Sequence, residues 1–269
     1  MEIIQKSYNE IIRRRKKSNN RLIMMEKEEN EINLEELYNN GKIIPYQAIY
    51  DISFKPVFKI KYKLGYIADQ LKRYYSETEI QKDPKINNEE RIVFIRNNIQ
   101  TIFSFTYLRV IEQFPDSKDF NLNKIKGEVS NFRSKVKAYL ENTEIPRIGV
   151  RFQYFGSLDK INKIKELNKI AIFKDLLKTV DRENDKIFSF KFHVFPDPMT
   201  EETVIQLLGG NNYEYELKEK KYKFEKAVLI DCIKGYFNPK SIELDYLTQT
   251  HKYIQEKVLN NLMEIREGE

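Results

Sequence analysis

A strict alternation of apolar residues constrains this chain more than any other feature of its sequence. From Ile44 to Tyr66 every even-numbered residue is apolar, whereas the odd-numbered positions include glutamine, aspartate, serine and several lysines. Neighbouring side chains of an extended chain point to opposite faces, so the alternation predicts half-buried strand. A single strand of this length would measure roughly 70 Å, which is too long for a small domain. Pro56 therefore predicts a break, with one strand on either side of it.

The second of these expected strands, FKIKYKLGY at residues 58–66, carries Lys59, Lys61 and Lys63 on one face. Its aromatic residues alternate with the lysines, so they point to the opposite face. Two interpretations of the lysines stay open at this point. They contact the phosphates of a nucleic acid, or they protect the edge of a sheet against aggregation.

The composition predicts a soluble protein with a real core. Of the 269 residues, 41% are hydrophobic and 33% are charged, so global disorder is not expected. The single cysteine excludes an internal disulfide and is typical of a reducing compartment. No apolar run reaches the length of a membrane span, and the first residues are charged where a signal peptide needs an apolar stretch. We therefore expect a cytoplasmic protein without membrane contact.

The net charge of +6 favours an anionic partner, but two explanations compete for it. Lysine accounts for 34 of the 47 basic residues, which is also the usage expected of an AT-rich coding sequence. The positions of the charges are therefore more informative than their sum. Residues 1–21 carry seven basic and two acidic side chains, or +5, whereas residues 22–40 carry one basic and six acidic side chains, or −5. Two interpretations stay open: a helical pair whose opposite charges face each other, or a basic arm masked by an acidic one until a partner arrives.

The clearest helix is expected at residues 121–142, where apolar side chains recur at spacings of three and four. Its other face is basic, with Glu128 as the acidic exception. The basic residues of this face are Lys124, Lys126, Arg133, Lys135 and Lys137. Together with the lysines of residues 58–66 they form, in this hypothesis, one nucleic-acid-binding surface.

The remaining elements alternate between strands and helices. We expect a helix from Asn87, with part of residues 87–114 ambiguous with strand, and strands at 147–155 and 186–195. Further helices are expected from Ser157 to Val180, from Thr200 to Gly209–Gly210, and from Ser241 to about residue 265, with a hairpin turning near residues 219–220. This order predicts an α+β protein with a mixed β-sheet and several helices. The expected domains are a charged helical arm at 1–40, an α+β lobe at 41–144 and an α/β lobe at 145–269.

Several enzyme classes have no motif here. The sequence contains no Walker loop, no dinucleotide fingerprint and no nucleophile elbow. Pro196–Asp197 followed by Glu216–Leu217–Lys218 resembles the Pro-Asp…Glu-x-Lys pattern of the metal-dependent nuclease fold. The resemblance implies that Asp197 and Glu216 hold a Mg²⁺ ion and that Lys218 orients the attacking water.

These observations predict a non-catalytic nucleic-acid-binding protein that acts as a subunit of a larger complex. The first alternative is a metal-dependent nuclease, and the second is a protein-binding subunit without nucleic-acid contact. No cofactor is expected apart from Mg²⁺ in the nuclease alternative. The choice between DNA and RNA, the protein partner and the oligomeric state stay open.

Overall fold

The computed structural model describes residues 33–83, 89–115, 117–157, 188–197, 200–217, 220–239 and 242–260. The chain divides into two compact units, Met1–Asn33 and Leu34–Glu269. The expected arm at residues 1–40 therefore lies mostly outside the described residues. Its last part is the short helix α2 (Leu34–Asn39), in which Leu34 is buried.

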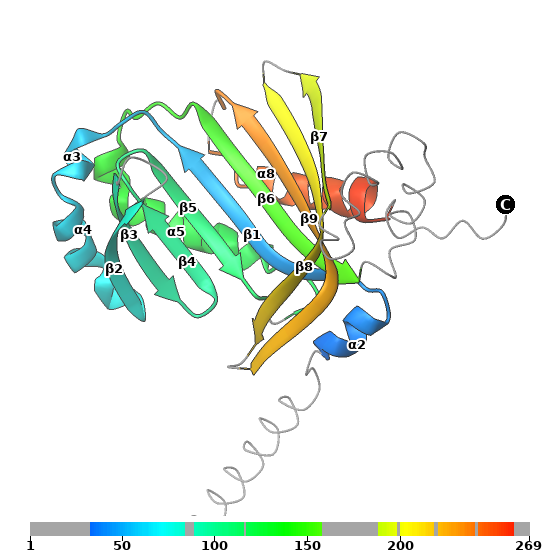
Figure 1. Ribbon diagram of the computed structural model, residues 1–269. Coiled ribbons are helices and arrows are strands. Elements are labelled where there is room, and N and C mark those ends of the chain that lie inside the picture. The colour runs from blue at the N-terminus through cyan, green and yellow to red at the C-terminus, as the bar shows by residue number, and fades with distance from the viewer. Residues whose placement is uncertain are drawn as a thin grey trace, which may run out of the picture. The chain divides into compact units, whose positions relative to one another are not determined.

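The second unit is built on one sheet of nine described strands, in the spatial order β2-β3-β4-β5-β1-β6-β9-β8-β7 (Figure 1). Every neighbouring pair is antiparallel. The strands are β1 (Ile44–Ser53), β2 (Glu77–Asp83), β3 (Glu89–Arg96), β4 (Ile99–Phe103), β5 (Tyr107–Gln113), β6 (Arg147–Ser157), β7 (Phe188–Asp197), β8 (Glu201–Leu217) and β9 (Lys220–Phe237). The α+β class is confirmed, but the sheet is antiparallel in the described residues rather than mixed.

Strand β1 lies between β5 and β6, so the sheet continues across the expected lobe boundary near residue 145. Tyr50, for example, is opposite Val110 on one side and Val150 on the other. Residues of the two expected lobes thus contribute strands to one sheet. The alternation of residues 44–53 correctly predicted β1, because Ala48, Tyr50 and Ile52 are buried in the main cluster while the residues between them are only half-buried.

Helix α5 (Leu122–Leu140) and helix α8 (Asp245–Tyr253) pack on one face of this sheet (Figure 1). A π-helical segment, η2 (Ile254–Leu259), continues α8. The helix expected at 121–142 is confirmed: the Asn121 side chain accepts a hydrogen bond from the Lys124 amide at 3.0 Å and caps it. Its buried stripe against the sheet includes Ile125, Val129, Phe132 and Val136. The proposed Ser241 cap of the last helix lies outside the described residues. Ser157, which was expected to cap another helix, is instead the last residue of β6, and the rest of that helix, to Val180, lies outside the described residues.

The helix expected from Asn87 was wrong, because residues 89–113 form the three strands β3, β4 and β5. Asn97 has a left-handed φ of 56° between β3 and β4, which marks a tight turn rather than a helix interior. These strands bury apolar side chains on both faces. Phe94 packs toward α5, whereas Val93 belongs to a small cluster with Ile102, Tyr107 and Ile111 on the other face. Burial on both faces removes the alternation that would have identified strand.

The short helix expected from Thr200 to Gly209–Gly210 was also wrong, since this segment lies within β8. The register of β8 against β9 shifts between Gly209 and Asn211 and again before Tyr213. The glycine pair therefore marks an irregularity of the strand rather than a helix end. The hairpin expected near residues 219–220 is confirmed by the pairing of Leu217 with Lys220. Among the described helices, none is long and apolar enough to cross a membrane.

Candidate nucleic-acid interface

The segment FKIKYKLGY forms helix, not strand. It comprises α3 (Phe58–Lys61) and the first part of α4 (Leu64–Leu71), followed by the 3-10 turn η1 (Lys72–Tyr74). Strand β1 ends at Ser53, so a break lies near Pro56, as expected. Ile60 of α3 and Leu64 and Ile67 of α4 are buried in the main hydrophobic cluster. Edge protection of a sheet is therefore excluded as the role of the lysines in this segment.

The helical geometry changes what surrounds the lysines. Phe58, Tyr62 and Tyr66 are 59%, 82% and 60% exposed, and they lie in α3, in the turn that follows it and in α4. Lys59, Lys61 and Lys63 are exposed beside these rings. An extended chain would have placed the aromatic rings and the lysines on opposite faces, whereas the helix presents both to solvent.

Two properties distinguish this part of the molecule. Five large hydrophobic side chains are exposed among the described residues, and four of them are the aromatic residues Phe58, Tyr62, Tyr66 and Tyr74. Residues 55–75 carry six basic side chains and one acidic side chain, a net +5, against +6 for the whole chain. We call the exposed side chains of residues 58–74 the α3–α4 surface. It combines exposed aromatic rings with a local excess of positive charge.

Contacts position several basic groups of the α3–α4 surface. The Lys59 ammonium donates a hydrogen bond to the carbonyl oxygen of Ala138 in α5 at 2.7 Å. The Lys61 ammonium lies 5.4 Å from the centre of the Phe105 ring, and Phe105 also stacks against Phe58. Lys72 forms an exposed ion pair with Asp69 at 2.5 Å. All three lysines are exposed, so their ammonium groups remain accessible to an anion.

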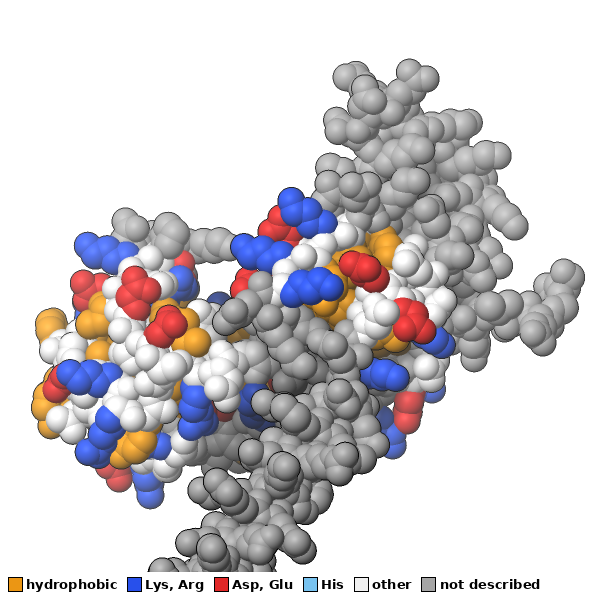
Figure 2. Space-filling view, turned by 90° about the horizontal axis from the view of Figure 1, so that it is seen from below, with side chains coloured by type: hydrophobic (Ala, Val, Ile, Leu, Met, Phe, Trp, Pro, Cys, Tyr) orange, Lys and Arg blue, Asp and Glu red, His pale blue; other side chains and the backbone are white. Residues whose placement is uncertain are grey.

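The surface continues onto α5 at one point. The Tyr74 ring has the Arg73 guanidinium 4.9 Å from its centre and the Lys135 ammonium at 4.6 Å. Figure 2 shows Lys and Arg side chains interspersed with hydrophobic and acidic ones at the end of the molecule that carries α3, α4 and β2. Lys135 is thus the basic residue of α5 that lies beside the α3–α4 surface.

The other basic residues of α5 point to different places. Successive helical residues are rotated by about 100°, which places Lys124 and Lys135 on one flank of α5 and Lys126, Arg133 and Lys137 on the opposite flank. Lys124 donates to the Asn98 side chain, and Lys126 forms an ion pair with Asp245 at 3.1 Å. Arg133 and Lys137 line a cavity beside the C-terminal part of α5. The five residues therefore do not form a single face with Lys59, Lys61 and Lys63.

The structure separates the residues of the nuclease pattern. Asp197 ends β7 opposite Glu201, the first residue of β8, whereas Glu216 lies near the far end of β8, opposite Lys221. From residue 201 to residue 216 is fifteen residues, a path of about 50 Å along an extended strand. Two carboxylates so placed cannot share one ion. Lys218 lies outside the described residues. Among the described residues, no group of three or more His, Cys, Asp and Glu side chains could hold a metal ion.

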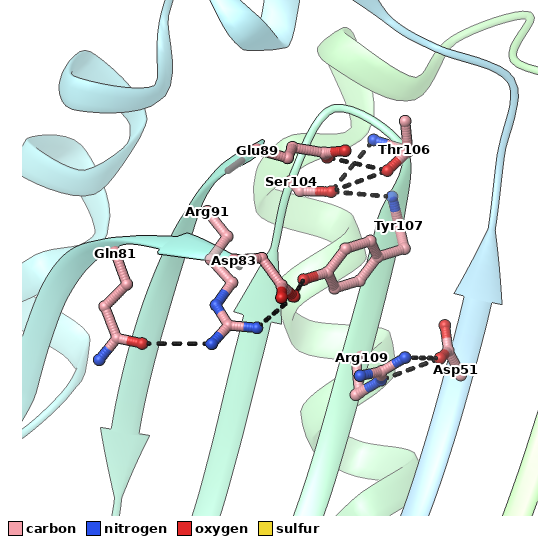
Figure 3. Close-up of polar contacts among 9 residues, drawn as sticks. All are labelled: Asp51, Gln81, Asp83, Glu89, Arg91, Ser104, Thr106, Tyr107 and Arg109. Carbon is pink, nitrogen blue, oxygen red and sulfur yellow. Dashed lines mark hydrogen bonds and ion pairs between the residues drawn. The ribbon is translucent and has the colours of Figure 1, made fainter. Parts of the chain in front are cut away.

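A polar cluster occupies the opposite face of the sheet from α5 (Figure 3). Arg91 pairs with Asp83 at 2.6 Å, and the Tyr107 hydroxyl donates to the same carboxylate at 3.3 Å. Arg109 binds Asp51 through two nitrogens. Each of these carboxylates already has an arginine partner, so the cluster ties neighbouring strands together and offers no open cation site.

Comparisons with known proteins give no independent guide to function. No protein-family model matches the chain, and its sequence matches no curated protein. The exposed aromatic residues of the α3–α4 surface were not among the expected binding residues, because the strand expected at residues 58–66 placed them on the face opposite the lysines.

Proposed function

We propose that this chain binds single-stranded nucleic acid through the α3–α4 surface. The observation that carries the proposal is the exposure of Phe58, Tyr62 and Tyr66 beside Lys59, Lys61 and Lys63. Lysine ammonium groups neutralise phosphates of the backbone, and aromatic rings stack against bases. Each stacked base contributes about 1–3 kcal/mol, so three accessible rings and three lysines can supply measurable affinity without a catalytic site.

The exposed rings favour a single strand over a duplex. Base faces are stacked on one another inside a double helix, whereas in a single strand they are free to stack on side chains. Lysines alone would fit either form, because phosphates are present in both. Lysine–phosphate contacts and stacking read little sequence information, so the proposed binding discriminates weakly among base sequences.

The test compares binding of a fluorescently labelled oligothymidine and its duplex by anisotropy. Wild-type protein is expected to prefer the single strand, and the triple variant Phe58→Ala/Tyr62→Ala/Tyr66→Ala is expected to lose about tenfold or more in affinity. The matched control is Tyr222→Ala, because Tyr222 is a partly exposed ring with the Lys220 ammonium 4.8 Å from its centre, on the β8–β9 hairpin. Absence of binding, or an equal loss in the control, contradicts the proposal.

A protein-binding subunit remains the second candidate, because exposed tyrosine and phenylalanine are also typical of protein interfaces. The same variants distinguish the two candidates. If Phe58→Ala/Tyr62→Ala/Tyr66→Ala leaves nucleic-acid affinity unchanged but abolishes recovery of a protein partner, the second candidate is correct. No observation on the described residues favours the nuclease alternative over these two.

A further inference from the structure

A cavity of about 410 Å³ lies between the C-terminal part of α5 and the sheet. Its walls are apolar where they are formed by β1, β5 and the segments that follow α5 and precede α8. The apolar lining residues are Ile52, Phe54, Leu108, Leu140, Ile145 and Ile242. Ligand cavities are commonly 300–1,000 Å³ in volume and combine apolar walls with a few polar groups. This cavity therefore has the size and the lining of a small-molecule site.

Arg133 supplies the main polar group of this cavity. Its side chain is half-buried, and among the described residues it has no carboxylate at ion-pair distance. Burial lowers the pKa of the Arg133 guanidinium below its ordinary value, while the neighbouring Tyr50 acts in the opposite direction. An arginine remains charged in spite of such a shift. A half-buried guanidinium beside apolar walls is a ready partner for an anionic group.

The remaining charged groups limit the charge of the ligand. Lys137 and Glu141 line the same cavity, and both side chains are exposed. Two basic groups and one acidic group give the lining a net charge of +1, which complements a single negative charge. Arg133 lies seven residues before the last residue of α5, so the partial negative charge at the helix end, which fades within one turn, does not oppose an anion there.

We propose that this cavity binds an amphipathic monocarboxylate of medium chain length. The carboxylate pairs with the Arg133 guanidinium through two parallel hydrogen bonds, and Lys137 contributes a second positive charge at the rim. The aliphatic chain lies against the apolar walls. At roughly 30 Å³ for each water-sized group, the cavity accommodates on the order of a dozen non-hydrogen atoms, which is the size of decanoate.

The test measures decanoate binding to the 269-residue chain by isothermal titration, below the concentration at which decanoate forms micelles. Wild-type protein is expected to bind one molecule saturably, and methyl decanoate, which has no charge, is expected to bind much more weakly. Arg133→Gln is expected to lose about 10- to 100-fold in affinity, the usual effect of a hydrogen bond to a charged group. Lys137→Gln is expected to lose less, because its side chain is exposed.

The matched control is Lys126→Gln, which removes one positive charge from the same flank of α5 outside the cavity. It is expected to bind decanoate as the wild type does. The proposal is overturned if the wild type shows no saturable binding, if Arg133→Gln binds as the wild type does, or if Lys126→Gln loses as much as Lys137→Gln. Should circular dichroism show that Arg133→Gln is unfolded, the comparison of Lys137→Gln with Lys126→Gln decides the outcome.

Discussion

The carboxylate of Glu128 illustrates how a single residue of α5 connects the helix to the sheet. It is buried and accepts hydrogen bonds from the Tyr75 hydroxyl at 2.7 Å and the Thr101 hydroxyl at 3.0 Å, and it also pairs with Arg96. We expect Glu128→Ala to lower the free energy of unfolding by about 3 kcal/mol, because it leaves two hydroxyls and a guanidinium without their acceptor. Urea denaturation followed by circular dichroism measures this change.

Glu144→Ala serves as the control for Glu128. Glu144 forms an ion pair with Lys55 in which both side chains are largely exposed, so its loss is expected to cost less than about 1 kcal/mol. Similar losses for both variants would show that the Glu128 network contributes little to stability. The sequence placed Glu128 on the basic face of a helix but could not predict its burial. Its partners Tyr75 and Arg96 are 53 and 32 residues away, and only the folded chain brings them together.

At the scale of whole elements, the sequence predicted those whose hydrophobic period was unambiguous. Residues 44–53 and 121–142 each show one period over their full length, and both elements are confirmed. Residues 58–66 alternate strictly, and this alternation predicted strand. The strand was wrong, because the buried residues of the segment are Ile60, Leu64, Ile67 and Leu71, at the spacings of three and four that are typical of helix.

The lysines of α3 and α4 give a prediction that concerns this helical segment as a unit. Replacing Lys59, Lys61 and Lys63 together by glutamine should flatten the slope of log affinity for single-stranded DNA against log salt by about 2, since each phosphate contact contributes roughly 0.7. The loss should be similar for different base sequences. Anisotropy titrations at several salt concentrations measure the slope.

The control for the lysine triple variant removes the same charge from another element. Lys220, Lys221 and Lys223 are the basic residues at the start of β9, and replacing all three by glutamine also lowers the net charge by three. A general effect of net charge would flatten the slope equally in both variants. If the lysines of the α3–α4 surface contact phosphates, the slope becomes flatter in the variant of Lys59, Lys61 and Lys63 but not in the variant of Lys220, Lys221 and Lys223.

The described part of the second unit is held together by one continuous sheet and one main core. The main hydrophobic cluster contains residues from α4, α5, α8 and strands on both sides of residue 145. A lobe boundary at this position was a reasonable expectation, because Pro146 follows a helix and a turn. A proline after a helix shows only where the helix ends. It does not show that β1 pairs with β6, because these two strands are separated along the chain by about a hundred residues.

Removing residues 1–32 should leave the second unit folded. Leu34–Glu269 is compact by itself and contains the whole described sheet, so the truncated chain keeps its core. We expect the melting temperature to change by less than about 2 °C, which corresponds to roughly 1 kcal/mol or less for a domain of this size. A much larger drop, measured by circular dichroism, would show that the first residues contribute to the core.

Alkaline pH should destabilise the whole molecule, because several buried groups keep their protons in the folded state. Burial raises the pKa of the Cys232 thiol to about 12, and it also raises the pKa values of Tyr50, Tyr75 and Tyr154. In the unfolded chain these groups lose their protons near their ordinary pKa values of 9.0 and 10.0. Above about pH 9 the unfolded state therefore binds fewer protons than the folded state, and the free energy of unfolding falls as pH rises. Each group contributes at most about 1.4 kcal/mol per pH unit.

Urea denaturation from about pH 8 to pH 11 should show this decline of the free energy of unfolding. Cys232→Ala should show a shallower decline, and an unchanged free energy of unfolding over this range would contradict the buried, protonated state of these groups.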